Sequence, residues 1–218
     1  LTEVAALLAI PFKQETYGSL TRFLFASVLL GTVYIVASRL LISATLPLWL
    51  DETWSAMIAT RGDWRAFWHE AWLDCNPPLY YLFLSGWVRL FGDSNFMLRL
   101  PSCLFTIAAA AMPTVWRPQG LNKAGAWTFA ALIILWQPGL QVVMDARGYS
   151  LMLLLSTASC LVVVRMLETL TLRRAAAWIA LGTMMFLTHY YAAALILGQA
   201  LVLFYRHGTR LLAVWPSI

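Results

Sequence analysis

The chain has 218 residues, of which 61% are hydrophobic and only 11% are charged. A soluble domain carries about 25% charged residues, so this chain has too few charges to cover a surface that faces water. The formal net charge of +5 does not indicate nucleic-acid binding, because the basic residues form short clusters between apolar runs, as membrane topology requires. The composition therefore predicts an all-α integral membrane protein.

The first membrane span is expected at residues 21–48, where an apolar run exceeds the roughly 20 residues that cross the hydrocarbon core. Residues 49–98 are rich in acidic residues and tryptophan, and we expect them to form one large external loop. Within this loop Trp64, Trp68 and Trp72 recur at every fourth position, which predicts a helix with one aromatic stripe lying at the membrane interface. Residues 77–91 are short for a full crossing and are expected to dip or lie flat.

Five apolar segments follow this loop. They predict spans at residues 99–116, 124–143, 148–166, 175–188 and 190–205. Placing the intervening basic clusters in the cytoplasm satisfies the positive-inside rule. The prediction is a single transmembrane module, a polytopic helical bundle of about six transmembrane helices. Because the chain opens with leucine, we expect it to be a fragment or to lack its recorded N-terminus.

This topology brings ionisable side chains together on the outer face of the membrane. They are Asp51, Glu52, Arg99, Asp145, Arg147 and His189. Charged groups at one membrane depth usually face a water-filled cavity or one another, so these residues are the first candidates for a functional site.

Six short motifs occur in an informative order along the chain. They are LDE at 50–52, NPPLYY at 76–81, LFGDS at 90–94, LRLPS at 98–102, DARGY at 145–149 and THYY at 188–191. This series resembles the N-terminal half of the GT-C membrane glycosyltransferases, above all the branch with protein O-mannosyltransferases and bacterial lipid A aminoarabinose transferases. The resemblance covers the chain from about residue 20. It departs at Asn76, where the family often has histidine.

The resemblance implies transfer of a sugar from a polyprenyl-phosphate donor at the external face of a membrane, here the bacterial inner (plasma) membrane. Asp51, with Glu52 beside it, would be the general base that takes a proton from the acceptor. Arg147 and Arg99 would contact the lipid phosphate, whose geometry arginine matches. The remaining pocket residues implied are Asn76, Tyr80, Asp145, Tyr149 and His189.

The expected partners are the polyprenyl-phosphate sugar donor and a lipid, protein or polysaccharide acceptor of the cell envelope. No cofactor and no metal site is established. Asp51 and Asp145 could hold a divalent cation, but two carboxylates are not a diagnostic ligand set. The alternative function is a non-catalytic lipid-binding or scaffolding subunit that has a partial GT-C fold.

Each candidate residue also has a structural interpretation. Asp51 could cap a helix that begins at Glu52. Asp145 and Arg147 could form an ion pair at a helix end, and Arg99 could extend to the interface as arginine often does near the end of a span.

Overall fold

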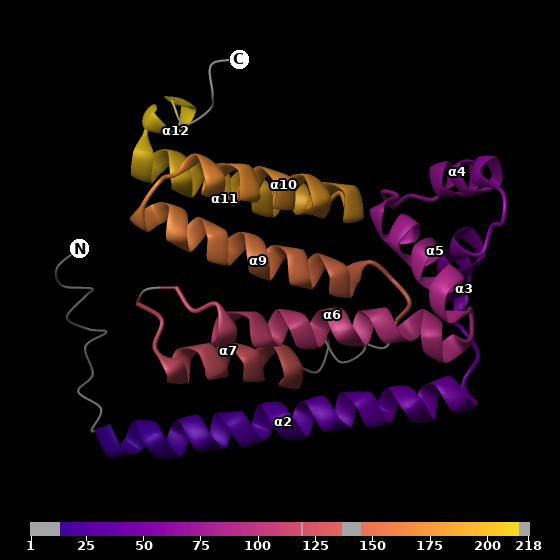
Figure 1. Ribbon diagram of the computed structural model, residues 1–218, viewed down its shortest axis with the longest axis horizontal. Coiled ribbons are helices and arrows are strands. Elements are labelled where there is room, and N and C mark those ends of the chain that lie inside the picture. Colours follow the sequence, from indigo (N-terminus) through magenta and orange to yellow (C-terminus); the bar gives the residue numbers. More distant parts are fainter. Residues whose placement is uncertain (1–13, 119, 137–144, 214–218) are drawn as a thin grey trace.

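The computed structural model describes residues 14–118, 120–136 and 145–213, and it contains helices but no strand within these ranges. Most of the longer helices run side by side along the long axis of the molecule (Figure 1). They are α2 (Gln14–Thr45), α6 (Asn95–Val115), α7 (Lys123–Leu135), α9 (Tyr149–Glu168), α10 (Leu172–Thr188) and α11 (Ala192–His207). A short helix, α12 (Arg210–Ala213), follows α11.

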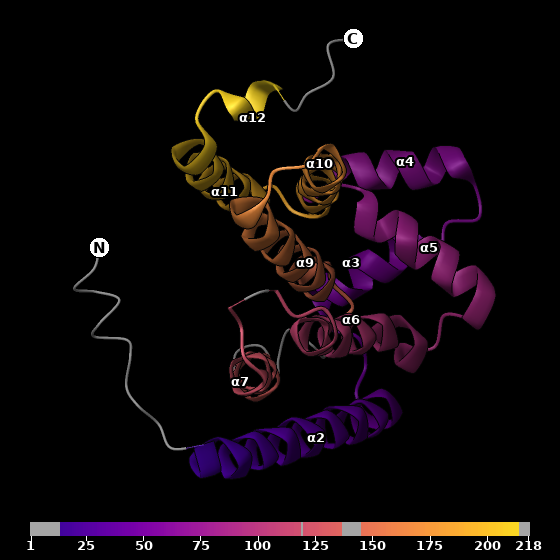
Figure 2. The ribbon, with the colours of Figure 1, turned by 60° about the vertical axis from the view of Figure 1, so that its left-hand side comes forward.

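Three further helices lie together at one end of this bundle. They are α3 (Leu50–Ala59), α4 (Trp64–Leu73) and α5 (Leu79–Phe91), and both views place them where α2 ends and where α6 and α9 begin (Figures 1 and 2). We call this the loop end of the bundle. The opposite end, where α6, α9 and α11 finish, is called the basic end.

Three helical segments are long and apolar enough to cross a membrane, which indicates a helical membrane protein. They are Gly18–Ser38, Asn95–Val115 and Tyr149–Glu168. Large apolar side chains on α2 point outward, since Phe23 is 68% exposed and Leu30 is 69% exposed. Water would penalise such a surface, whereas a lipid environment would not.

The shorter apolar helices are Leu79–Phe91, Lys123–Leu135 and Ala192–His207. Helix α7 ends at Leu135, with Trp136 as its C-cap, so it covers the first part of the span expected at residues 124–143. The remainder of that expected span, residues 137–144, lies outside the described residues.

Helix α4 carries the aromatic stripe that the sequence predicts. Trp64, Trp68 and Trp72 are all exposed, while Phe67, whose ring stacks on that of Trp64, is fully buried. The carboxylate of Asp63 accepts a hydrogen bond from the third backbone N–H of the helix at 3.0 Å, which caps the N-terminus. The stripe is therefore available to a surface outside the molecule, as an interfacial helix requires.

A buried apolar cluster joins the loop end to the bundle. It contains Ile58 of α3, Phe67 of α4, Leu84 of α5, Leu98 of α6 and Met185 of α10, none of them more than 2% exposed. Burying such a side chain contributes about 1.5–3 kcal/mol, so the cluster holds α3, α4 and α5 firmly in place. The loop end is thus packed against the bundle, and its helices hold their polar side chains in fixed positions.

Candidate functional site

A buried ion pair between Glu52 and Arg99 lies at the centre of the loop end. The Nε and Nη2 atoms of Arg99 donate to the two carboxylate oxygens of Glu52 at 2.8 and 2.5 Å. Arg99 also donates to the carbonyl oxygens of Leu46 and Pro47, at 3.3 and 3.0 Å. Glu52 is 1% exposed and Arg99 is 3% exposed. The interpretation that Arg99 extends to the interface is therefore wrong, because all three of its guanidinium nitrogens have acceptors inside the protein.

The Glu52 carboxylate also accepts two backbone hydrogen bonds. The N–H of Ala146 lies 2.9 Å from one oxygen, and the N–H of Trp49 lies 3.2 Å from the other. Burial alone would raise the pKa of Glu52, but the hydrogen bonds from Arg99, Ala146 and Trp49 outweigh it and hold the pKa below its usual value. One carboxylate thus ties together α3, α6 and the segment that precedes α9.

Asp51 lies beside Glu52 but faces another way. Helix α3 begins at Leu50 and Trp49 occupies the cap position, so the interpretation of Asp51 as the cap is wrong. The Asp51 side chain is 38% exposed, and its Oδ2 atom lies 3.8 Å from Nη2 of Arg147. The backbone carbonyl oxygen of Asp51 also accepts a hydrogen bond from Nη1 of Arg147, at 3.4 Å. Of the two adjacent carboxylates, Asp51 is therefore the accessible one and Glu52 the buried one.

Arg147 is largely buried, with 10% of its side chain exposed. Burial disfavours its charge, but the neighbouring Tyr81 and Asp51 outweigh that effect and raise the pKa of Arg147. Its guanidinium carbon also lies 6.0 Å from the centre of the Tyr149 ring, at the limit of a cation–π contact. A buried guanidinium of permanent charge is a suitable group to bind an anion.

A small cavity next to Arg147 brings together three motifs that are distant in the sequence. Its lining comprises Asn76, Pro77, Tyr80, Tyr81, Arg147, Gly148, Tyr149, Thr188 and His189. These residues come from the start of α5, the start of α9 and the turn between α10 and α11. The space inside is about 10 Å³, room for roughly one water molecule. Five of the residues expected at a pocket from the sequence thus line one cavity.

Tyr81 and Asn76 converge on one carboxylate at the edge of this cavity. The Tyr81 hydroxyl donates a short hydrogen bond to Oδ2 of Asp74, and Nδ2 of Asn76 donates to the same oxygen at 3.3 Å. Burial and the Asp74 carboxylate both raise the pKa of Tyr81, so its hydroxyl stays protonated. Asn76 therefore has an orienting partner in a position where the resembling family often has histidine.

His189 closes the cavity at the turn between α10 and α11. Its Nδ1 atom accepts a hydrogen bond from the N–H of Tyr191 at 3.3 Å, and its ring lies 5.8 Å from that of Tyr149. Burial and the positive charge of Arg147 both lower the pKa of His189. The imidazole is thus neutral at pH 7, with Nδ1 as an acceptor.

The segment that carries Arg147 is fixed by α6 and by close packing. The hydroxyl of Ser102 donates to the carbonyl oxygen of Asp145 at 2.6 Å, and the Arg147 N–H donates to the same oxygen at 2.8 Å. A Cβ atom at Gly148 would lie only 3.2 Å from the Thr188 side chain and 3.4 Å from that of Tyr80. Glycine therefore allows the three motifs to meet.

The described residues contain no group of three or more His, Cys, Asp or Glu side chains that could hold a metal ion. Asp51 and Asp145, the two carboxylates considered for a divalent cation, are both partly buried.

Several residues that shape the site had no assigned role in the sequence analysis. They are Asp74, Tyr81, Ser102 and Thr188. Tyr81, Ser102 and Thr188 lie within quoted motifs, so motif membership was an available signal. Ser102 acts through a backbone carbonyl 43 positions away, and no sequence pattern indicates such a contact.

The charged side chains of the site differ in accessibility. Glu52 and Arg99 bind each other, whereas the side chain of Asp51 is partly exposed and Arg147 borders a cavity. No protein-family model, curated protein sequence or solved structure matches this chain.

Proposed function

We propose that this chain is a GT-C-type glycosyltransferase module, which moves a sugar from a polyprenyl-phosphate donor to an acceptor at the external face of the membrane. One observation carries the proposal: Asp51 lies 3.8 Å from Arg147, and Arg147 borders the cavity in which three distant motifs meet. An accessible carboxylate beside a buried guanidinium supplies both groups that the reaction needs, a base for the acceptor and a cation for the leaving phosphate.

The proposed step is a direct displacement at the anomeric carbon. Asp51 takes the proton from the hydroxyl or amine of the acceptor, and the acceptor atom forms a bond to the anomeric carbon. The bond from that carbon to the phosphate oxygen breaks, and its electron pair stays on the lipid phosphate. Arg147 stabilises the charge that develops there. A single displacement of this kind inverts the anomeric centre.

Glu52 and Arg99 have a positioning role in this proposal. Their mutual hydrogen bonds leave neither carboxylate nor guanidinium available for a substrate. The Glu52 carboxylate instead accepts a hydrogen bond from the N–H of Ala146. Ala146 directly precedes Arg147 in the chain, and Asp51 directly precedes Glu52. The pair therefore sets the distance between the proposed base and the proposed phosphate ligand.

The remaining cavity residues would contact the sugar or the phosphate. Asn76 and Tyr80 come from the start of α5, and Tyr149 and His189 flank Arg147. Neutral His189 and the amide of Asn76 offer uncharged hydrogen-bonding groups, which suit sugar hydroxyls. A larger ligand requires the narrow cavity to widen at its mouth.

The proposed topology has six crossings, with the loop end outside. Basic residues support this orientation, because Arg117, Arg165 and Arg206 all lie at the ends of helices away from α3, α4 and α5. The positive-inside rule places such residues in the cytoplasm. Asp51 and Arg147 would then face the outside of a bacterial inner (plasma) membrane, where lipid-linked sugars are used.

A second candidate function is a non-catalytic lipid-binding or scaffolding subunit. The observation that favours it is the size of the cavity, about 10 Å³, which holds no sugar in the present conformation. A subunit of this kind would use Arg147 to bind phosphate but would need no base. The two functions therefore make the same prediction for Arg147 and different predictions for Asp51.

Binding of polyprenyl-phosphate sugars to the chain in nanodiscs tests the proposal. We expect Arg147→Ala to weaken donor binding by on the order of 10- to 100-fold, because a charged hydrogen bond to phosphate is lost. Arg89→Gln is the matched control, since Arg89 is an exposed arginine on α5 of the same loop end, and it should bind as the wild type does. Absence of donor binding by the wild-type chain would contradict the proposal.

A further inference from the structure

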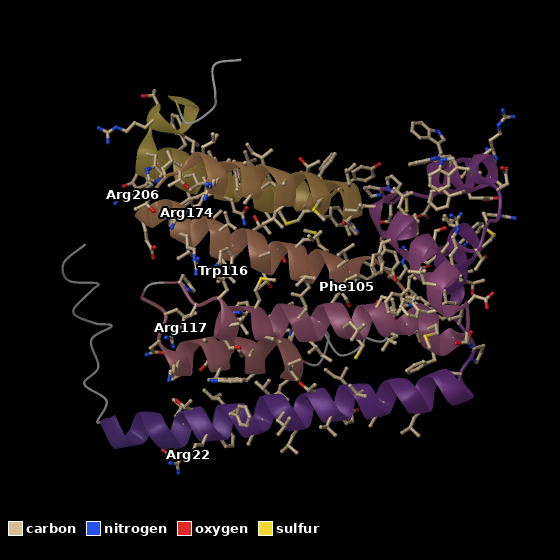
Figure 3. The ribbon with its side chains drawn as sticks, viewed as in Figure 1. Arg22, Phe105, Trp116, Arg117, Arg174 and Arg206 are labelled. Atoms are coloured by element: carbon tan, nitrogen blue, oxygen red, sulfur yellow. The ribbon has the colours of Figure 1, made fainter. Side chains whose placement is uncertain are left out.

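Basic side chains gather at the end of the bundle opposite to the proposed active site. Figure 3 labels four of them there, Arg22, Arg117, Arg174 and Arg206, together with Trp116. They come from different parts of the chain: the start of α2, the α6–α7 connection, the start of α10 and the end of α11. The ion pairs among the described residues all lie at the loop end. Among the described residues, therefore, no ion pair joins a basic side chain of this end to a carboxylate.

Two grooves open at this end and share residues. The larger has a volume of about 690 Å³ and lies between the start of α2 and the start of α7, with Arg22, Phe25, Lys123 and Trp127 in its lining. The second has a volume of about 510 Å³ and is also lined by Lys123 and Trp127. The two grooves are neighbours, because they share Lys123 and Trp127 in their linings, and together we call them the basic groove.

The second part of the basic groove carries most of the positive charge. Arg117, Lys123 and Arg165 line it, and neither groove has an acidic residue in its lining. The guanidinium carbon of Arg165 lies 4.0 Å from the centre of the Trp116 ring, a close cation–π contact. Its Nη2 atom lies 3.5 Å from the carbonyl oxygen of Arg117. Arg165 is thus held against the wall of the groove, where it can meet an anion.

The other part of the basic groove is walled by aromatic rings. The Phe25 and Trp127 rings meet edge to face with their centres 5.1 Å apart. A third depression of about 460 Å³ lies farther along α7 and is lined by apolar side chains, among them Leu24 of α2 and Phe129 and Leu132 of α7. An apolar surface therefore follows the basic residues along the axis of α7.

We propose that the basic groove binds one anionic phospholipid, with its phosphate at Arg117, Lys123 and Arg165 and an acyl chain along α2 and α7. Positive charge alone would accept any phosphate, but the apolar depression farther along α7 suits a molecule that also has a hydrocarbon chain. Basic pockets between transmembrane helices at the cytoplasmic side are suited to anionic headgroups. This site is separate from the proposed active site and does not depend on the proposed reaction.

Retention of lipid by the purified chain, measured by native mass spectrometry, tests this inference. The protein in detergent is mixed with equal amounts of phosphatidylglycerol and phosphatidylcholine of the same chain length. We expect the wild type to retain phosphatidylglycerol preferentially, and Lys123→Ala to weaken that binding about fivefold, as removal of one basic residue near a headgroup should. Lys123→Arg keeps the charge and should keep the preference. Lys123 is exposed, so none of these changes removes a buried contact.

Arg173→Gln is the matched control, because Arg173 is exposed at the same end but does not line the basic groove. It should leave the retention of phosphatidylglycerol unchanged. Equal retention of the two lipids by the wild type would overturn the inference, as would an equal loss in Arg173→Gln and Lys123→Ala. Displacement of the lipid by glycerol phosphate alone would also overturn it, since the site would then recognise free phosphate.

Discussion

The carboxylate of Asp51 lies 3.8 Å from the guanidinium of Arg147, although the two residues are 96 positions apart in the chain. The contact joins a partly exposed carboxylate to a largely buried guanidinium at the border of a cavity. Its geometry depends on the next residue along, because Glu52 holds both Arg99 and the backbone N–H of Ala146. The two adjacent acidic residues therefore differ in environment: Asp51 is partly exposed beside Arg147, whereas Glu52 is buried and connects Arg99 with the segment that precedes α9.

Removal of one partner from the Glu52–Arg99 pair should strongly destabilise the protein. Glu52→Leu leaves Arg99 buried without its carboxylate, which costs about 3–5 kcal/mol in the free energy of unfolding. The double variant with Arg99→Leu should cost less than the sum of the two single changes. Denaturant unfolding in detergent measures both. Glu70→Leu, which breaks the more exposed pair with Arg61, is the control and should cost at most about 1 kcal/mol. An equal loss for Glu52→Leu and Glu70→Leu would contradict the account.

The stability of the protein should fall in acid through Glu52. The folded protein lowers the pKa of Glu52, so its ionised form stabilises the fold above the unfolded value of about 4.3. This contribution is lost as the pH falls from that value through the lower pKa of the folded state. Thermal unfolding followed between pH 7 and pH 3 should show a smaller acid-induced decrease for Glu52→Gln than for the wild type. Identical pH dependence of the two proteins would show that Glu52 is not responsible.

The contact between α2 and α7 should depend on a glycine. A Cβ atom at Gly31 would lie 2.3 Å from Cγ2 of Ile134, so Gly31→Ala forces the helices or the Ile134 side chain to shift. Overpacking of this kind typically costs about 1–3 kcal/mol. Gly18→Ala, on the same helix with no neighbouring atom within 4 Å, is the matched control. Its thermal midpoint should equal or exceed that of the wild type, whereas the midpoint of Gly31→Ala should be lower.

The proposed orientation can be tested with the native cysteines. Cys75 is exposed in the connection between α4 and α5, at the loop end, and Cys103 is buried. In sealed vesicles of known orientation, a membrane-impermeant maleimide should label Cys75 from the outer side only. Cys75→Ser should lose this labelling, because the other exposed thiol, Cys160, lies in the middle of apolar helix α9. Labelling of Cys75 from the inner side alone would reverse the topology.

The helical pattern could be predicted because apolar runs are a local property, whereas the meeting of the motifs was expected from the family resemblance. Apolar runs and basic clusters indicate where helices begin and end, and the chain turns at His189, between the spans expected at residues 175–188 and 190–205. The order of the motifs led us to expect Asn76, Arg147 and His189 near one another, and the three line one cavity.

The different environments of Asp51 and Glu52 could not be predicted in full. Adjacent positions on a helix point about 100° apart, so the side chains of Asp51 and Glu52 face different directions. Which of the two is buried depends on Arg99 and on the Ala146 N–H, which are 47 and 94 positions away. Such contacts follow from the packing of α3 against α6 and the start of α9, and no local pattern encodes them.

Turnover by Asp51→Asn tests the central claim most directly. The chain in nanodiscs is supplied with a polyprenyl-phosphate sugar and candidate acceptors, and the release of polyprenyl phosphate is measured beside donor binding. The account predicts that the wild type releases polyprenyl phosphate. Asp51→Asn should bind the donor as well as the wild type does, but it should release polyprenyl phosphate about 10²- to 10⁴-fold more slowly, because the general base is lost. Release by Asp51→Asn at the rate of the wild type would contradict the claim that Asp51 is the base.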